Sequence, residues 1–149
     1  MQHIIEPHGS SALKALFVAD SRENERLREE AQRLPSIVIS SAAAANAVML
    51  GAGYFNPLAG YMNKADALSV ARDLKTTTGL FWPAPVLNLV QDASALAPGQ
   101  RVALRDPNVV GAPVLAVMDV EAIETLSDEE ADLIVHNVFR TADPNHPGV

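Results

Sequence analysis

The order of helix and strand patterns most constrains how this 149-residue chain can fold. Charged and alanine-rich helical segments fill most of the first third, and β-branched segments bounded by proline, glycine and asparagine fill the middle. A last helical pattern runs from Ser127 to about Phe139. Because strands do not alternate regularly with helices, the order favours an α+β architecture over repeated βαβ units, and it does not support a Rossmann sheet.

Five helices are predicted from apolar spacing and from capping residues. A short helix can begin at Ser10 and Ser11, which are good helix caps. Its apolar positions, Leu13, Leu16 and Phe17, follow three-and-four spacing, so this helix should face a core. The other four helices are predicted over residues 21–34, 42–50, 66–74 and 127–139.

The predicted helix over residues 21–34 is crowded with charge. Its opposite charges recur three or four residues apart, at Glu23 and Arg26, Glu25 and Arg28, and Glu29 and Arg33. This pattern is typical of a solvated helix face. A docking face for a charged partner is the alternative interpretation.

Two other helix ends carry sequence signals. Gly51 stands where a left-handed residue would end the helix over residues 42–50. Ser127 and Glu130 form a capping-box pattern at the start of the last helix. Glu129 and Glu130 should therefore complement the helix dipole there rather than act as an acid–base pair.

Four strands are predicted, over residues 36–40, 83–89, 101–104 and 114–120, and they should form one mixed or mostly antiparallel sheet. The first has the β-branched density of a buried strand. The stretch from Leu80 to Pro85 has the most unusual local composition. We expect Phe81 and Trp82 to pack in the core while the prolines prevent pairing at a sheet edge. An exposed binding edge is the alternative.

The charge balance argues against several classes of partner. The chain has 11 Lys and Arg against 18 Asp and Glu, a net charge of -7, which repels phosphate backbones and anionic lipid. An aromatic content of 5% offers no stacking platform for single strands. The first 16 residues contain no uninterrupted apolar run. We expect no nucleic-acid partner, no membrane association and a cytoplasmic location, which the lack of cysteine also suits.

No recognisable catalytic motif is present. The chain has no cysteine, no Gly-Lys-Ser or Gly-Lys-Thr of a P-loop, and no Gly-x-Ser-x-Gly elbow. Its histidines lack the spacing that places two imidazoles on one helix face; they are His3, His8, His136 and His146. Asp143 with His146 is the strongest metal fragment, but such a loop is more typical of a hydrogen-bonded turn. We predict no catalytic, cofactor-binding or metal-binding residues in this chain.

Five short segments together carry a resemblance to a known family. They are Pro7-His8-Gly9-Ser10 with Leu13, Gly53-Tyr54-Phe55-Asn56-Pro57-Leu58 with Gly60-Tyr61-Met62, Trp82-Pro83-Ala84-Pro85-Val86, Val102-Ala103-Leu104-Arg105-Asp106, and Phe139-Arg140-Thr141-Ala142-Asp143 with His146-Pro147-Gly148-Val149. In this order, over nearly the whole chain, they resemble the N-terminal PUA-like domain of the ATP sulfurylase (sulfate adenylyltransferase) family. Ser10, Asn56 and Tyr61 depart from the commoner glycine, serine and phenylalanine, which affects only loop detail.

The resemblance implies one PUA-like domain over residues 1–149, with a mixed, mostly antiparallel sheet or small barrel. The family joins ATP and sulfate into adenylyl sulfate and pyrophosphate, which requires clustered cations and hydrogen-bond donors. In the family these groups belong to a following α/β domain with Gln-x-Arg-Asn-Pro and Gly-Arg-Asp-His-Ala-Gly motifs, and neither motif occurs here. We expect the chain to stop near the start of that domain, to hold no cofactor, and to be inactive alone, while its parent uses ATP with Mg²⁺.

The resemblance also implies a structural and interface role against the parent's own catalytic domain, and a homo-oligomer is left open. We expect the interface in the loop from Tyr54 to Met62 and in the tail from Thr141 to Val149. The alternative is that both segments simply cover the domain's own core. A free-standing PUA-like module that binds a small ligand or peptide is the competing function. The PUA-like label suggests RNA binding, but the negative charge argues against it.

Overall fold

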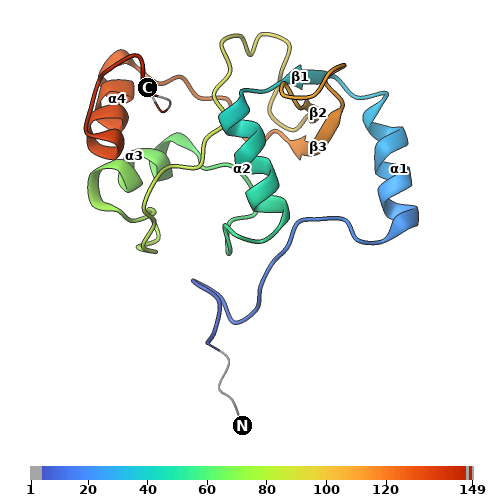
Figure 1. Cartoon of the computed structure of the whole chain (residues 1–149), viewed down its shortest axis with the longest axis horizontal. Coiled ribbons are helices and arrows are strands. Elements are labelled where there is room, and N and C mark those ends of the chain that lie inside the picture. Colours follow the sequence, from blue (N-terminus) through green and yellow to red (C-terminus); the bar gives the residue numbers. More distant parts are fainter. Residues whose placement is uncertain (1–4, 147, 149) are drawn as a thin grey trace. The chain divides into compact units, whose positions relative to one another are not determined.

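The computed structural model describes residues 5–146 and residue 148. The helices and strands are, in chain order, α1 (Ser21–Ala31), β1 (Ser36–Val38), α2 (Ser41–Gly51), α3 (Lys64–Asp73), β2 (Arg101–Arg105), β3 (Val114–Asp119), α4 (Asp128–Ile134) and the π-helical turn η1 (Val135–Phe139). The three strands form one mixed sheet in the order β1-β2-β3 (Figure 1). The predicted α+β class is confirmed, and among the described residues this sheet is open rather than closed into a barrel.

The contacts within the chain divide it into two compact units. The first comprises Met1–Tyr61 and Asn88–Ile123, and the second comprises Met62–Leu87 and Glu124–Val149. The second unit is therefore built from two segments that are far apart in the sequence. The single domain predicted over residues 1–149 stays a prediction.

Strand β2 lies at the centre of the sheet in the first unit. It pairs with β1 in parallel, Ser36 opposite Ala103, and with β3 antiparallel, Val117 opposite the same Ala103. The side chains of Val102 and Leu104 are buried completely or nearly so. Together with buried Ile39, they form a core cluster into which α2 packs through Ala43 and Ala44. These alanines lack bulky side chains, so the helix can approach the sheet closely.

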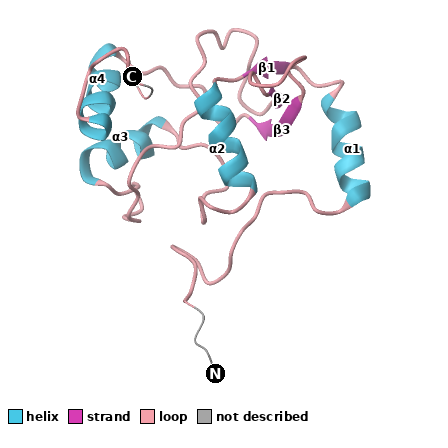
Figure 2. Cartoon of the chain, viewed as in Figure 1, coloured by secondary structure: helices cyan, strands magenta, loops and turns pink. Residues whose placement is uncertain are grey.

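Helix α1 is polar over almost its whole surface, and Figure 2 shows it as a separate helix beside the strands. It begins at the cap Asp20, whose carboxylate accepts a hydrogen bond from the Glu23 N–H at 2.8 Å. Ala31 is its one buried residue. Apolar burial therefore contributes little to holding this helix in place.

The second unit packs α3 against the helix formed by α4 and η1. Leu68, Ala71 and Ile134 are its buried cluster, with Leu126 and Val138 among the half-buried residues around it. Both bonds of the predicted capping box between Ser127 and Glu130 are present. The predicted helix does reach Phe139, but its last turn is π-helical.

The helix predicted over residues 10–17 is wrong. Residues 5–20 form turns and extended backbone, and the three predicted core positions, Leu13, Leu16 and Phe17, are exposed. The physical reason lies in Asn56. Its side chain bonds the backbone of His8 and Lys14, so these groups are satisfied without helical i to i−4 pairing.

The strand predicted over residues 83–89 is also wrong, because the structure shows no strand there. Pro83 and Pro85 have no N–H to donate to a ladder. The Met62 N–H donates to the Val86 carbonyl at 2.8 Å, but this single backbone bond does not make a strand. Of the two neighbouring aromatic residues, Trp82 is buried as predicted. Phe81 is 55% exposed, which contradicts its expected place in the core.

Two local predictions also need correction. Gly51 lies within α2, and Gly53, with a φ of 80°, is the left-handed residue beyond the end of the helix. Strand β1 is a three-residue strand at the sheet edge rather than the buried strand predicted over residues 36–40. Val38 is exposed, whereas Ile37 is half-buried against the core cluster and the following Ile39 is buried within it.

Candidate functional site

The loop after α2, predicted as part of an interface, is organised around the buried side chain of Asn56. Its Oδ1 accepts a hydrogen bond from the Lys14 N–H at 2.9 Å. Its Nδ2 donates to the His8 carbonyl at 2.9 Å and to the Ser10 Oγ at 2.8 Å. The peptide bond between Asn56 and Pro57 is cis. One side chain thus fixes the segment before α1, residues 5–20, which we call the N-terminal arm.

Some residues of the same loop lie at the surface and others lie in the core. Tyr54 is 74% exposed, whereas Met62 at the other end of the predicted interface is buried. Tyr61 packs against the first unit's core and donates a hydrogen bond from its hydroxyl to the Ala43 carbonyl at 2.8 Å. Burial raises the pKa of Tyr61 to about 12. Tyr61 and Met62 are therefore turned toward the protein's own interior, whereas Tyr54 faces outward.

The N-terminal arm runs against the C-terminal end of α2. The Phe17 N–H donates to the Gly51 carbonyl at 2.9 Å. Gly53 lies so close to the arm that a Cβ placed there would lie 3.3 Å from the Leu13 Cγ and from the Lys14 oxygen. The arm's backbone is therefore held in place although the Leu13 and Phe17 side chains remain exposed.

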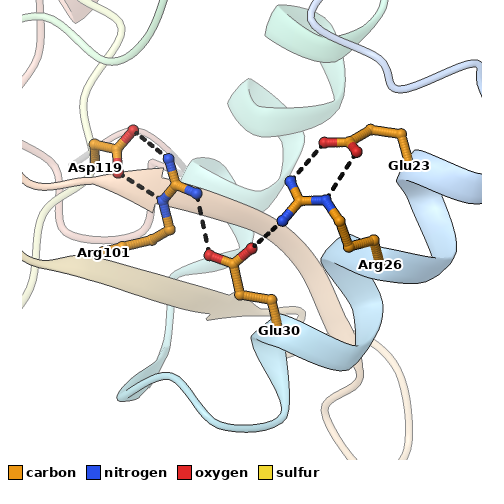
Figure 3. A network of polar contacts seen from close by, with 5 residues as sticks. All are labelled: Glu23, Arg26, Glu30, Arg101 and Asp119. Atoms are coloured by element: carbon orange, nitrogen blue, oxygen red, sulfur yellow. Dashed lines mark hydrogen bonds and ion pairs between the residues drawn. The ribbon is translucent and has the colours of Figure 1, made fainter.

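A chain of ion pairs joins α1 to the sheet (Figure 3). Arg26 binds the carboxylates of Glu23 and Glu30 at 2.7 and 3.1 Å. Glu30 in turn binds Arg101 at 3.1 Å, and Arg101 binds Asp119 at 2.8 Å. The hydrogen bonds from Arg101 lower the pKa of the Asp119 carboxyl below its usual value. The pair predicted between Glu23 and Arg26 is confirmed, whereas Arg28 bonds Asn24 instead.

The described part of the tail folds back on its own unit. The rings of Phe139 and His146 lie 5.2 Å apart between centroids. A Cβ on Gly148 would collide with the Phe139 ring. This supports the alternative that residues 141–146 and 148 cover the unit's own surface. Pro147 and Val149, which belong to the predicted interface tail, lie outside the described residues, as does His3.

Asp143 and His146 form a turn. The Asp143 Oδ1 accepts hydrogen bonds from the backbone and side-chain nitrogens of Asn145, both at 2.9 Å. These bonds lower the pKa of the Asp143 carboxyl. The His146 N–H donates to the Asp143 carbonyl at 2.9 Å. Both residues therefore serve the turn that the sequence favoured over a metal site.

No group of three or more His, Asp or Glu side chains within residues 5–146 and 148 could hold a metal ion. In the same part of the chain, no helix has both the length and the apolar character needed to cross a bilayer.

Two kinds of contact between distant parts of the chain were not predicted from the sequence. They are the bonds of Asn56 with the arm and the bond of Glu30 with Arg101. Asn56 is a polar residue in a loop, and its burial depends on an arm 42 to 48 positions away in the chain. The bond between Glu30 and Arg101 spans 71 positions. Helical spacing could have indicated neither contact. Tyr54, which is exposed, lies in the predicted interface loop. The neighbouring arm, in contrast, was expected to form a helix that faces the core.

Comparisons with known proteins place these features in a family. A family model described as a PUA-like domain matches residues 5–149. The sulfate adenylyltransferase of Alcanivorax borkumensis is 58% identical over 149 residues, which are 100% of this chain and 37% of that enzyme. The sulfate adenylyltransferase of Allochromatium vinosum is 55% identical over 146 residues, 98% of this chain and 37% of the enzyme. The chain thus spans little more than a third of the length of these curated relatives.

A solved structure shares the fold. It is described as a hexameric APS kinase from Thiobacillus denitrificans, and it superimposes with a TM-score of 0.68 at 30% sequence identity. The match covers 83% of this chain and 24% of that chain. From the family model and these relatives, the chain belongs to the PUA-like domain family and matches the N-terminal part of sulfate adenylyltransferases.

Proposed function

We propose that this chain is the non-catalytic N-terminal part of a sulfate adenylyltransferase, an enzyme that joins ATP and sulfate into adenylyl sulfate and pyrophosphate. One observation carries the proposal: the identity of 58% to such an enzyme extends over the whole chain. The fragment accounts for 37% of that relative's length, so the remaining length would supply the reaction centre.

The electrostatics of the chain support a non-catalytic role. A site for ATP and sulfate needs cations that are free to face the two anions. Here Arg26, Arg101 and Lys64 already form ion pairs with carboxylates. The Arg105 guanidinium donates to the Ser36 hydroxyl and the Ala112 carbonyl. With a net charge of -7, the chain offers little positive potential to a nucleotide.

In this proposal, the metal ion of the parent enzyme binds outside this chain. ATP chemistry normally uses Mg²⁺, which is held by one or two carboxylates together with phosphate oxygens. Within residues 5–146 and 148, no three His, Asp or Glu side chains gather into a group that could hold a metal ion. We assign Mg²⁺ and ATP to the rest of the parent enzyme, which would supply the reaction centre.

The proposed role is to pack against the catalytic part of the parent and to stabilise it. The fold relative described as a hexamer supports the further proposal that the parent enzyme associates with itself. We also propose a cytoplasmic location, since the parent reaction uses ATP. Nucleic acid is not proposed as a partner.

Two measurements test this function. The reading frame after Val149 should continue into the catalytic part of a sulfate adenylyltransferase. The longer protein should release pyrophosphate from ATP and sulfate, while the 149-residue chain alone should release none above background. Pyrophosphate formation by the chain alone, or a longer protein without this activity, would overturn the proposal.

A further inference from the structure

Helix α2 has an apolar outer face without any charge. None of its 11 residues is Asp, Glu, Lys or Arg. Ala43, Ala44 and Leu50 are its buried residues, yet Ala42, Ala45 and Val48 on other sides of the helix are exposed. A surface helix normally carries charged or polar residues on its outer side, and a helix that is apolar all round is normally buried. The composition of α2 therefore suits a helix that is covered on both sides.

Two exposed aromatic residues are tied by backbone hydrogen bonds to the C-terminal end of α2. The arm's Phe17 is bonded through its N–H to Gly51, the last residue of α2. Tyr54 donates its N–H to the Met49 carbonyl at 3.0 Å, which keeps this residue against the same helix end. Phe17 is 69% exposed, Tyr54 74% and Val48 56%. We call these four exposed residues, Ala45 and Val48 of α2 with Phe17 and Tyr54 bonded at its C-terminal end, the α2 face.

The backbone beneath this face is fixed in advance. Asn56 holds the arm through Lys14 and His8, so the two aromatic side chains start from constrained positions. Ordering side chains on binding costs free energy, and a surface that is already ordered avoids part of that cost. Aromatic residues at the centre of an interface commonly dominate its binding energy. The α2 face therefore combines exposed apolar side chains with a backbone that is already fixed, as a docking surface requires.

We infer that the α2 face is covered by the catalytic part of the parent enzyme; this rests on the proposed function. The relatives that match this chain over its whole length are nearly three times as long, so most of their polypeptide is available to cover an apolar surface. A face without charge suits a permanent contact within one protein, because transient contacts between proteins are more polar. A second copy of the chain is the competing occupant, and the test separates the two.

Hydroxyl-radical footprinting of the parent enzyme tests the assignment directly. Oxidation of Phe17 and Tyr54 should be at least about tenfold slower in the native parent than in the urea-unfolded parent, since coverage excludes solvent radicals. Oxidation within about twofold of the unfolded rate would overturn the inference. Protection that disappears when the enzyme is diluted to monomers would also overturn it, because the cover would then be a second copy.

A matched pair of variants in the parent enzyme gives an independent readout. Val48→Asp places a charge on the α2 face and should lower the melting temperature by several degrees, because a charge buried without a partner is costly. Val110→Asp places the same charge at a fully exposed position outside this face and should leave the melting temperature unchanged. Equal melting temperatures for both variants would contradict the coverage of the α2 face.

The same preparation separates a failure of this inference from a failure of the proposed function. Pyrophosphate release from ATP and sulfate reports the function, whereas footprinting reports the covered face. An active parent with freely oxidised Phe17 and Tyr54 would keep the function and remove the docking surface. An inactive parent with protected side chains would remove the function and leave the face covered.

Discussion

Glu30 of α1 and Arg101 of β2 form an ion pair across 71 positions of sequence, with the Nη1 and Oε1 atoms 3.1 Å apart. This contact connects a polar helix with one buried residue to the central strand of the sheet. Arg101 also binds Asp119, so one guanidinium ties α1 to both antiparallel strands. The ion pairs of Arg101 thus link α1 to the sheet, in addition to the contact of the buried Ala31.

The first prediction concerns this ion pair. Arg101→Gln should lower the melting temperature slightly in dilute buffer, because it removes the links to both Glu30 and Asp119. The difference from the unmodified chain should shrink as NaCl is raised toward 1 M, since salt screens exposed charges. Glu25→Gln is the control, because no ion pair of Glu25 occurs among the described contacts. A difference that does not respond to salt would show that the link is not electrostatic.

The second prediction concerns Asn56. Asn56→Ala should lower the free energy of unfolding by about 2 kcal/mol, because buried partners in the arm lose their hydrogen bonds. Urea denaturation measures the change, and limited proteolysis should show faster cleavage within residues 5–20. Asn56→Asp keeps the acceptor for the Lys14 N–H but loses the donors to His8 and Ser10. Because its second carboxylate oxygen would face the His8 carbonyl in a buried site, it should be at least as destabilising as Asn56→Ala. An arm equally resistant to protease in all three proteins would contradict this role.

The third prediction compares two glycines two positions apart. Gly53→Ala should destabilise the chain by about 1–2 kcal/mol, because its φ of 80° is unfavourable for a side chain. Its Cβ would also press on Leu13 and Lys14 at 3.3 Å. Gly51→Ala, inside α2 with open space around it, should instead be neutral or stabilising by up to about 1 kcal/mol. Thermal unfolding of the two variants should give shifts of opposite sign or clearly unequal size.

The fourth prediction compares two adjacent aromatic residues. Trp82→Ala should cost about 3–5 kcal/mol of unfolding free energy, because the side chain is buried. Phe81→Ala should cost less than about 1 kcal/mol, since Phe81 is 55% exposed. Chemical denaturation followed by circular dichroism measures both. Equal costs would mean that Phe81 is packed as the sequence suggested.

The fifth prediction is a pH dependence at the start of α4. The Ser127 N–H, together with Lys64, lowers the pKa of Glu130 below its usual 4.5. A carboxyl with a lowered pKa in the folded state stabilises the fold above pH 4.5 and loses this effect as the pH falls through the lowered value. The urea midpoint of the unmodified chain should exceed that of Glu130→Gln at pH 6. The gap should close on acidification, and a gap constant from pH 6 to pH 3 would contradict the assignment.

The sequence predicted elements whose cause is local. The helix over α2, the capping box of Ser127 and Glu130, and strands β2 and β3 depend on residues within a few positions of one another. Capping side chains and β-branched runs act over such short distances. The resemblance identified the family because the five segments keep their order along the whole chain.

The failures arose where distant residues override local preference. The arm has helical spacing, yet Asn56 takes up its backbone groups from more than 40 positions away. Residues 83–89 have strand composition, yet their prolines cannot donate to a neighbouring strand. Of the predicted interface loop, Tyr54 faces outward and Tyr61 turns to the core, and nothing in the local pattern distinguishes these two tyrosines.

The parallel pairing of β1 with β2 has a consequence for synthesis on the ribosome. Ser36 meets Ala103, so the first strand has no partner until more than 65 later residues have been made. Throughout that time α2 lacks the strand residues Val102 and Leu104 that cover its inner side. A nascent chain of this protein therefore exposes both sides of a helix without charged residues until β2 has been made, and such exposed apolar surface favours aggregation.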